Sequence, residues 1–113
     1  MKIWVDSNPK SYAIVFESGK IETGKFDKPL TNNEAEYTVI IKALEIPNFQ
    51  PLEILSDSQL VIKQLTLEYF IREDRLRELA QKVWKLAQNK FLHQGVTFHW
   101  VPRIENKAGK ILG

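Results

Sequence analysis

The chain lacks the features that would set it apart from ordinary globular proteins. It contains no cysteine, so neither a disulfide framework nor a thiolate metal site can form. It has no apolar run long enough to cross a bilayer and no signal-peptide pattern. No internal repeat, low-complexity tract or linker divides its 113 residues. We therefore expect one cytoplasmic domain covering residues 1–113, with no membrane partner.

A strong charge surplus is also missing, because the formal net charge is only +2. A mildly basic protein can bind a polyanion, but its charge alone does not argue for one. The contents of 43% hydrophobic and 27% charged residues are typical of globular domains. We expect a monomer whose function has to be inferred from particular residues.

Apolar periodicity predicts the element order β-β-β-α-β-α-α-β-α. Short turns join the first three strands, which predicts an antiparallel meander. Helices between the later strands favour crossovers and parallel pairing. The predicted strands cover residues 2–5, 12–16, 21–26, 52–56 and 96–101, and the last helix covers residues 106–112. The predicted fold class is α/β, with a mixed five-stranded sheet (three antiparallel strands, then parallel ones) and helices on both faces.

Three acids occupy positions where their side chains can converge. Asp6 and Asp57 each follow a predicted strand, and the carboxyl ends of strands in open α/β sheets are where ligands bind. Glu36 lies in the first turn of the connecting helix, on its sheet-facing side. Three close carboxylates repel one another, and a divalent cation removes that penalty. All-oxygen ligands favour Mg²⁺ or Mn²⁺, and two such ions are the usual device for phosphodiester hydrolysis.

Each of these acids also has a purely structural interpretation. Asn33 and Glu36 have the spacing of a capping box. Asp57 precedes a helix and can be its N-cap, and Asp6 can initiate the turn that follows it. All three acids at one sheet edge, in this order, favour the metal site over three independent structural roles.

Four segments resemble type 1 ribonuclease H, and most closely its short archaeal and bacterial forms. These segments run in family order and are Trp4-Val5-Asp6, Thr31-Asn32-Asn33-Glu34-Ala35-Glu36-Tyr37, Ser56-Asp57-Ser58-Gln59-Leu60-Val61 and Trp100-Val101-Pro102-Arg103-Ile104-Glu105-Asn106. The resemblance implies an RNase H-like fold and cleavage of the RNA strand of RNA/DNA hybrids by two metal ions, Mg²⁺ or Mn²⁺. It implies that Asp6, Glu36 and Asp57 are three of four metal-binding acids.

The same resemblance suggests residues that bind the hybrid. Asn32, Asn33 and Gln59, together with Ser58, resemble residues that contact the minor groove and the 2′-hydroxyls, which distinguish RNA from DNA. Arg103 occupies the loop where the family has a mobile histidine, and it can hold a phosphate. Trp84, beside the cations of the long helix, can contact the DNA strand; alternatively, it belongs to an ordinary solvated helix face.

The C-terminal segment departs from the family pattern. Where the family has its fourth acid, this chain has Lys110 in an ungapped alignment, or Gly109 after a one-residue deletion. Neither residue offers a side-chain ligand for a cation. Glu105 and Asn106 offer alternative oxygen ligands, and Asn106 can instead cap the last helix. The sequence therefore leaves open a full nuclease with a displaced ligand, a weak nuclease, or a module that binds hybrids without cleaving them. A 3′–5′ exonuclease of the same fold is expected to have an Asp-x-Glu pair on its first strand. In this chain Asn8 occupies the position of the Glu.

Overall fold

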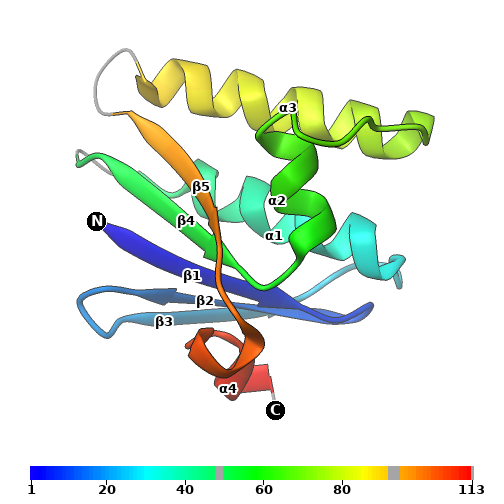
Figure 1. The fold of residues 1–113 in the computed structure, drawn as a ribbon. Helices are drawn as coiled ribbons and strands as arrows, with labels where there is room; N and C mark the ends of the chain where they lie inside the picture. The colour runs from blue at the N-terminus through cyan, green and yellow to red at the C-terminus, as the bar shows by residue number, and fades with distance from the viewer. Residues whose placement is uncertain (48–49, 92–94, 113) are drawn as a thin grey trace.

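Five strands form one sheet in the order β3-β2-β1-β4-β5 (Figure 1). The computed structural model describes residues 1–47, 50–91 and 95–112. The elements are β1 (Lys2–Ser7), β2 (Ser11–Phe16), β3 (Ile21–Lys25), α1 (Asn32–Glu45), β4 (Leu52–Ser56), α2 (Gln59–Leu65), α3 (Asp74–Phe91), β5 (Val96–Trp100), the 3₁₀ helix η1 (Arg103–Glu105) and α4 (Gly109–Leu112). Among these elements, no helix is both long and apolar enough to cross a membrane.

The strand directions confirm the predicted fold class. β1, β2 and β3 form an antiparallel meander, whereas β4 pairs parallel to β1 and β5 pairs parallel to β4. The register aligns Trp4 of β1 with Leu55 of β4. Because these two strands are parallel neighbours, their carboxyl ends meet at one edge of the sheet.

The sheet separates two apolar clusters. Alternating strand residues such as Val5 and Ile54 pack against α1 and α3, which lie on one side of the sheet together with α2 (Figure 1). The smaller cluster on the other side joins Trp4 and Leu55 to Ala108 beside α4. The predicted helices on both faces are therefore present. The carboxyl edge of β1 and β4 lies between the α1 layer and the α4 layer.

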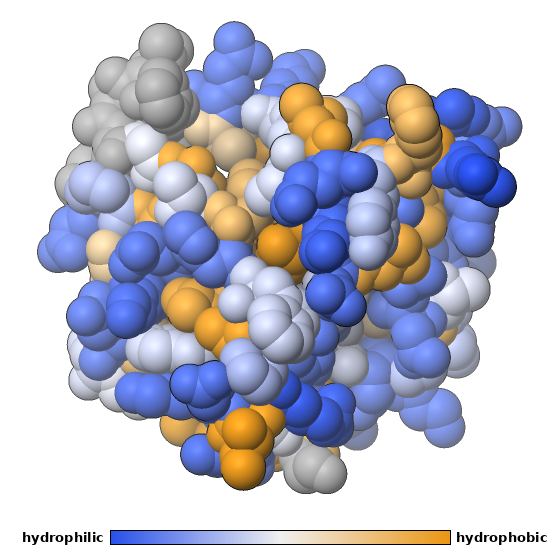
Figure 2. Space-filling model, viewed as in Figure 1, coloured by the Kyte–Doolittle hydropathy of each residue, from blue (hydrophilic) through white to orange (hydrophobic). Residues whose placement is uncertain are grey.

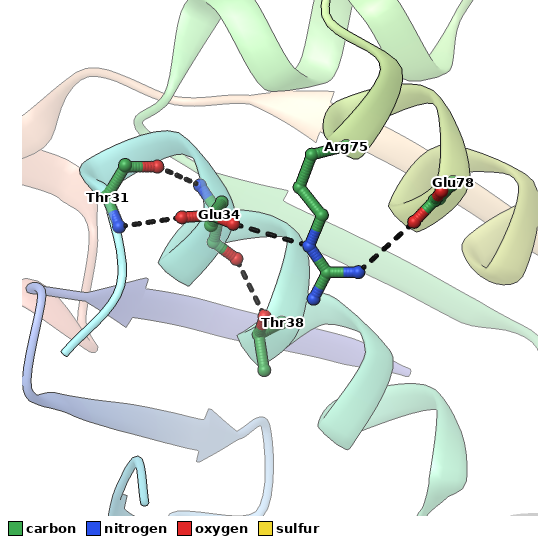
Figure 3. A network of polar contacts seen from close by, with 5 residues as sticks. All are labelled: Thr31, Glu34, Thr38, Arg75 and Glu78. Atoms are coloured by element: carbon green, nitrogen blue, oxygen red, sulfur yellow. Dashed lines mark hydrogen bonds and ion pairs between the residues drawn. The ribbon is translucent and has the colours of Figure 1, made fainter. Parts of the chain in front are cut away.

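The N-terminus of α1 is capped by residues other than those the sequence suggested. Thr31 accepts a hydrogen bond from the backbone N–H of Glu34, and the Glu34 carboxylate accepts one from the backbone N–H of Thr31 (Figure 3). Arg75 of α3 also contacts Glu34, at 3.3 Å. The capping box is therefore Thr31 with Glu34, and its assignment to Asn33 with Glu36 is wrong. Glu36 is free for another role.

The helix predicted over residues 106–112 begins three residues later in the structure and is preceded by a separate 3₁₀ turn. η1 covers Arg103–Glu105, and α4 begins only at Gly109. Asn106 lies between them in an extended conformation, and its side-chain oxygen accepts a hydrogen bond from the backbone N–H of Ala108 at 3.1 Å. Because this side chain is fully buried and bonded to other parts of the fold, the backbone cannot continue as one regular helix.

The connector between α2 and α3 begins with a residue in a strained conformation. Leu67 has a φ of +66° and follows α2 in a Schellman arrangement, in which its N–H bonds to the Gln64 carbonyl and the N–H of Glu68 bonds to that of Lys63. The left-handed region costs an L-residue roughly 1–2 kcal/mol. We expect Leu67→Gly to raise the free energy of unfolding by about 0.5–1 kcal/mol, net of the greater chain entropy of glycine. Leu67→Ala, which keeps the strain, serves as control; urea unfolding would measure both.

Candidate active site

Three carboxylates meet at the carboxyl edge of β1 and β4. Asp6 is the fifth residue of β1, Asp57 directly follows β4, and Glu36 lies in the first half of α1. Each offers one carboxylate oxygen, and these three oxygens lie within 4.8 Å of one another. Glu36 lies 30 positions after Asp6 and 21 positions before Asp57 in the sequence. The parallel β1–β4 pair and the packing of α1 across it bring the three acids together.

Neighbouring residues, and not the acids, cap α2 and hold the turn after β1. Ser58, rather than Asp57, caps α2 and accepts a hydrogen bond from the Val61 N–H at 3.4 Å. The turn after β1 is held by the Asn8 side chain, whose oxygen accepts hydrogen bonds from the N–H groups of Lys10 and Ser11. Both structural interpretations of Asp57 and Asp6 are therefore wrong. Together with the Thr31 cap, this shows that none of the three acids caps a helix or holds the turn after β1.

Glu36 is held by two hydroxyl groups deep in the site. It is only 7% exposed, and its carboxylate accepts hydrogen bonds from Ser56 Oγ at 2.8 Å and from Ser7 Oγ. Burial raises the pKa of Glu36 from 4.5 to about 7; the two hydroxyls oppose this shift, while the charges of Asp6 and Asp57 add to it. The site therefore disfavours the ionised carboxylate in the absence of a cation, although it holds that carboxylate in one orientation.

The pKa of Asp6 is also raised by burial and a neighbouring acid and lowered by a hydrogen bond. Burial and the neighbouring Asp57 charge raise the pKa of Asp6, whereas the Ser7 N–H and the Arg103 guanidinium partly offset the rise. Arg103 is exposed at the start of η1, and its charge acts on Asp6. Two acids with raised pKa values around a third carboxylate form a site that a divalent cation would stabilise.

Because burial raises the pKa of Glu36, we expect the stability of the fold to depend on pH when no divalent cation is present. Between about pH 4.5 and pH 7 the folded protein binds more protons at Glu36 than the unfolded chain does. The free energy of unfolding should therefore fall as the pH rises through this window, by on the order of 3 kcal/mol. Chemical denaturation in EDTA would measure the fall.

Glu36→Gln supplies the control, since a neutral amide of the same shape should flatten the slope. The raised pKa of Asp6 acts in the same direction, so some slope is expected to persist in this variant. A stability that rises with pH across this window in the wild-type protein would contradict a raised pKa of Glu36 in the folded state.

Asn106 links the carboxylate cluster to the strand beneath it. Its side chain is fully buried, and its Nδ2 donates to the Val5 carbonyl and to Asp57 Oδ2, both at 3.0 Å. Its Oδ1 accepts from the Ala108 N–H. A carbonyl on one side and an N–H on the other fix the orientation of the amide. Asn106 therefore presents its nitrogen to Asp57, and its oxygen is engaged elsewhere.

The other predicted residues lie in the surrounding surface. Asn32 and Gln59 are exposed at the start of α1 and α2, Asn33 is half-buried, and Ser58 is the α2 cap. Asn33 also lines a cavity of about 440 Å³ together with the exposed Phe70 of the α2–α3 connector. Hydrophobic surface is visible over this connector at the upper right of Figure 2. Glu105 is exposed in η1 and is not part of the carboxylate group.

Trp84 lies farther along α3, where it packs at the margin of the main core. Its indole N–H donates to the Leu65 carbonyl at 3.0 Å, and its ring lines a cavity of about 370 Å³. The wall of this cavity also includes Phe70 and Gln64. Trp84 of α3 is thus half-buried against the end of α2, and it is not a purely solvated helix residue.

The sequence interpretation missed Ser7 and Ser56, the two hydroxyl donors to Glu36. The alternation of side chains along β1 and β4 could have indicated both serines. Ser56 continues the face that includes Ile54, and Ser7 continues the face that includes Val5. That face packs against α1, so hydroxyls placed at its end reach the first turns of the helix.

Comparisons with known proteins agree with this fold. A family model described as RNase H matches residues 4–108. RNase H1 from the halophilic archaeon Halobacterium salinarum is 27% identical, with a TM-score of 0.75 over 98% of this chain and 90% of that one. The N-terminal RNase H domain of a Mycobacterium tuberculosis protein is 20% identical, with a TM-score of 0.77 over 98% and 93%. LC11-RNase H1, solved in complex with an RNA/DNA hybrid, is 21% identical, with a TM-score of 0.75 over 99% of each chain.

Proposed function

Because the chain belongs to the RNase H family, we propose that it is an endoribonuclease that hydrolyses the RNA strand of RNA/DNA hybrids with Mg²⁺ or Mn²⁺. The observation that carries this proposal is the convergence of Asp6, Glu36 and Asp57, whose oxygens lie within 4.8 Å of one another. The hybrid bound to LC11-RNase H1, a protein of the same fold, supports this choice of substrate.

In this proposal the three carboxylates hold the cations at the sheet edge. Their oxygens fit hard divalent ions, and cation binding would offset the burial and repulsion that raise the pKa values of Asp6 and Glu36. When bound, two such ions supply an activated water and stabilise the leaving 3′-oxygen. Ser7 and Ser56 keep the Glu36 carboxylate oriented, and the Asn106 amide does the same for Asp57.

Polar residues around the cluster have the chemistry needed for a hybrid. Asn32, Asn33 and Gln59 carry amides that both donate and accept, as recognition of a 2′-hydroxyl requires. All three begin helices near an acid of the cluster, at the start of α1 and α2. Ser58 belongs to the same group, because it lies between Asp57 and Gln59 in the sequence. We assign to Arg103, whose charge acts on Asp6, the binding of a phosphate of the scissile strand.

Cleavage assays with labelled duplexes test the proposal directly. The protein should cut the RNA strand of an RNA/DNA hybrid in Mg²⁺ or in Mn²⁺, and EDTA should abolish the cutting. RNA/RNA and DNA/DNA duplexes of the same sequence serve as matched substrates, and we expect neither to be cut at a comparable rate. Equal cutting of all three duplexes would contradict the assigned specificity.

One observation favours a second candidate function. No fourth carboxylate joins Asp6, Glu36 and Asp57 among the residues that the structure describes. A module on the same fold that binds hybrids without cutting them is compatible with such a site, since fold does not fix function. Retained binding of the hybrid, with no cleavage in either metal, would support this candidate over the nuclease.

A further inference from the structure

The first residue of α4, Gly109, lies beside the carboxylate cluster. A Cβ atom placed on Gly109 would lie 3.4 Å from Asp6 Oδ2 and 3.9 Å from Asp57 Oδ2. Both are van der Waals contacts, so a side chain at this position would extend directly beside the two carboxylates. α4 packs on the face of the sheet opposite α1. Gly109 therefore faces Asp6 and Asp57 from the side opposite the helix that carries Glu36.

The tertiary structure selects between the two alignments of the C-terminal segment. Lys110 is exposed, whereas Gly109 is half-buried beside the acids. Asn106 does not act as a fourth oxygen ligand, because its Oδ1 accepts a hydrogen bond from the Ala108 N–H and its Nδ2 donates one to Asp57. The place of a fourth ligand is thus occupied by a residue without a side chain.

We propose that Gly109 leaves one of the two cation positions short of a protein ligand, so that this chain binds two divalent cations with unequal affinity. This inference rests on the proposed metal-dependent function. The cluster supplies three carboxylates, and a residue at position 109 is the one that could complete the side facing Asp6 and Asp57. A weakly held second cation would make cleavage depend steeply on the metal concentration, because in-line hydrolysis uses both ions.

Gly109→Asp is the variant that should complete the site. The two contact distances allow a Cβ atom at this position, and the backbone of Gly109 does not have the left-handed conformation that favours glycine. A fourth carboxylate adds repulsion when no cation is present and an oxygen ligand when one is. Gly109→Asn adds the oxygen ligand without the charge, so it separates coordination from repulsion.

Isothermal titration calorimetry with MnCl₂ tests the proposal without relying on activity. The wild-type protein should bind one Mn²⁺ tightly and a second much more weakly, and Gly109→Asp should tighten the weak step at least tenfold. Thermal unfolding with and without Mn²⁺ gives a second readout, since a ligand that binds only the folded state raises its stability. The Mn²⁺-induced rise in Tm should be larger for Gly109→Asp than for the wild type.

Two matched controls define what would overturn the inference. Gly109→Ala adds bulk without a ligand, and Lys110→Asp adds an acid one residue away, at the position chosen by the ungapped alignment. Neither should tighten the weak step. Two equal sites in the wild type, no tightening in either Gly109→Asp or Gly109→Asn, or equal tightening by Lys110→Asp would each overturn it.

The same proteins separate this inference from the proposed nuclease activity. If Gly109→Asp tightens the second cation but neither it nor the wild type cuts a hybrid, the nuclease proposal fails and the inference about Gly109 holds. If the wild type cuts hybrids and binds two cations equally, the nuclease proposal holds and the inference fails.

Discussion

Asp57→Asn is expected to lower the rate of hybrid cleavage by roughly a thousandfold, equivalent to about 4 kcal/mol of transition-state stabilisation. Asp57 is one of three acids within 4.8 Å of one another, and an amide binds a divalent cation far less strongly than a carboxylate does. Single-turnover cleavage of a labelled hybrid at saturating Mg²⁺ would measure the loss.

The fold should survive this substitution. An asparagine at position 57 can still offer an oxygen to the Asn106 amide, and removing the Asp57 charge takes away repulsion that raises the pKa values of Asp6 and Glu36. The Tm without metal should therefore be unchanged or higher, which distinguishes a lost ligand from lost folding. Asp27→Asn, an exposed acid outside the cluster, is the matched control and should cleave as the wild type does. Wild-type rates in both variants would contradict the assignment of Asp57.

Asn106→Ala is expected to cost about 3 kcal/mol of stability and to loosen Asp57. The substitution removes the partners of the buried Val5 carbonyl and the Ala108 N–H, and each unsatisfied group costs roughly 1–3 kcal/mol. For a chain of this size the Tm should fall by roughly 10 °C. Differential scanning calorimetry would measure the fall, with the exposed Asn89→Ala as the matched control.

A second readout separates positioning of Asp57 from support of the fold. At a temperature where Asn106→Ala is still folded, its Mn²⁺ affinity should be lower than that of the wild type, because Asp57 has lost the donor that orients it. Asn106→Asp keeps the shape but turns an acceptor toward the Val5 carbonyl and Asp57, so it should be less stable at neutral pH than in acid. Unchanged Mn²⁺ affinity in Asn106→Ala would leave Asn106 with a structural role alone.

The sequence predicted the sheet well because its signals were local and redundant. Strands of alternating or continuous apolar residues, short turns between the first three, and helical periods between the later ones all favoured the same fold class. The predicted strand at residues 52–56 coincides with β4. The remaining strand boundaries differ by only one or two residues, such as β1 continuing through Asp6 to Ser7.

The helix caps were harder to predict because neighbouring residues compete for the same role. Thr31 and Asn33 are both good N-cap residues, and each is followed three positions later by a glutamate, Glu34 or Glu36. Only the packing of α1 on the sheet chooses the phase that buries Glu36 and leaves Glu34 at the surface. The same ambiguity applied to Asp57 and Ser58 at the start of α2, where the serine is the cap.

The sequence by itself determined the fold class and the order of the three acids, because both follow from residue types at fixed spacings along the chain. It could not determine what completes the cluster. That depended on contacts across about a hundred residues, between Asn106 and Val5 and between Gly109 and Asp6. A one-residue gap leaves the local pattern almost unchanged, yet it decides whether a lysine or a glycine faces the carboxylates. Only the packing of the C-terminal segment against β1 fixes that choice, because the buried Asn106 side chain anchors the segment in a single register.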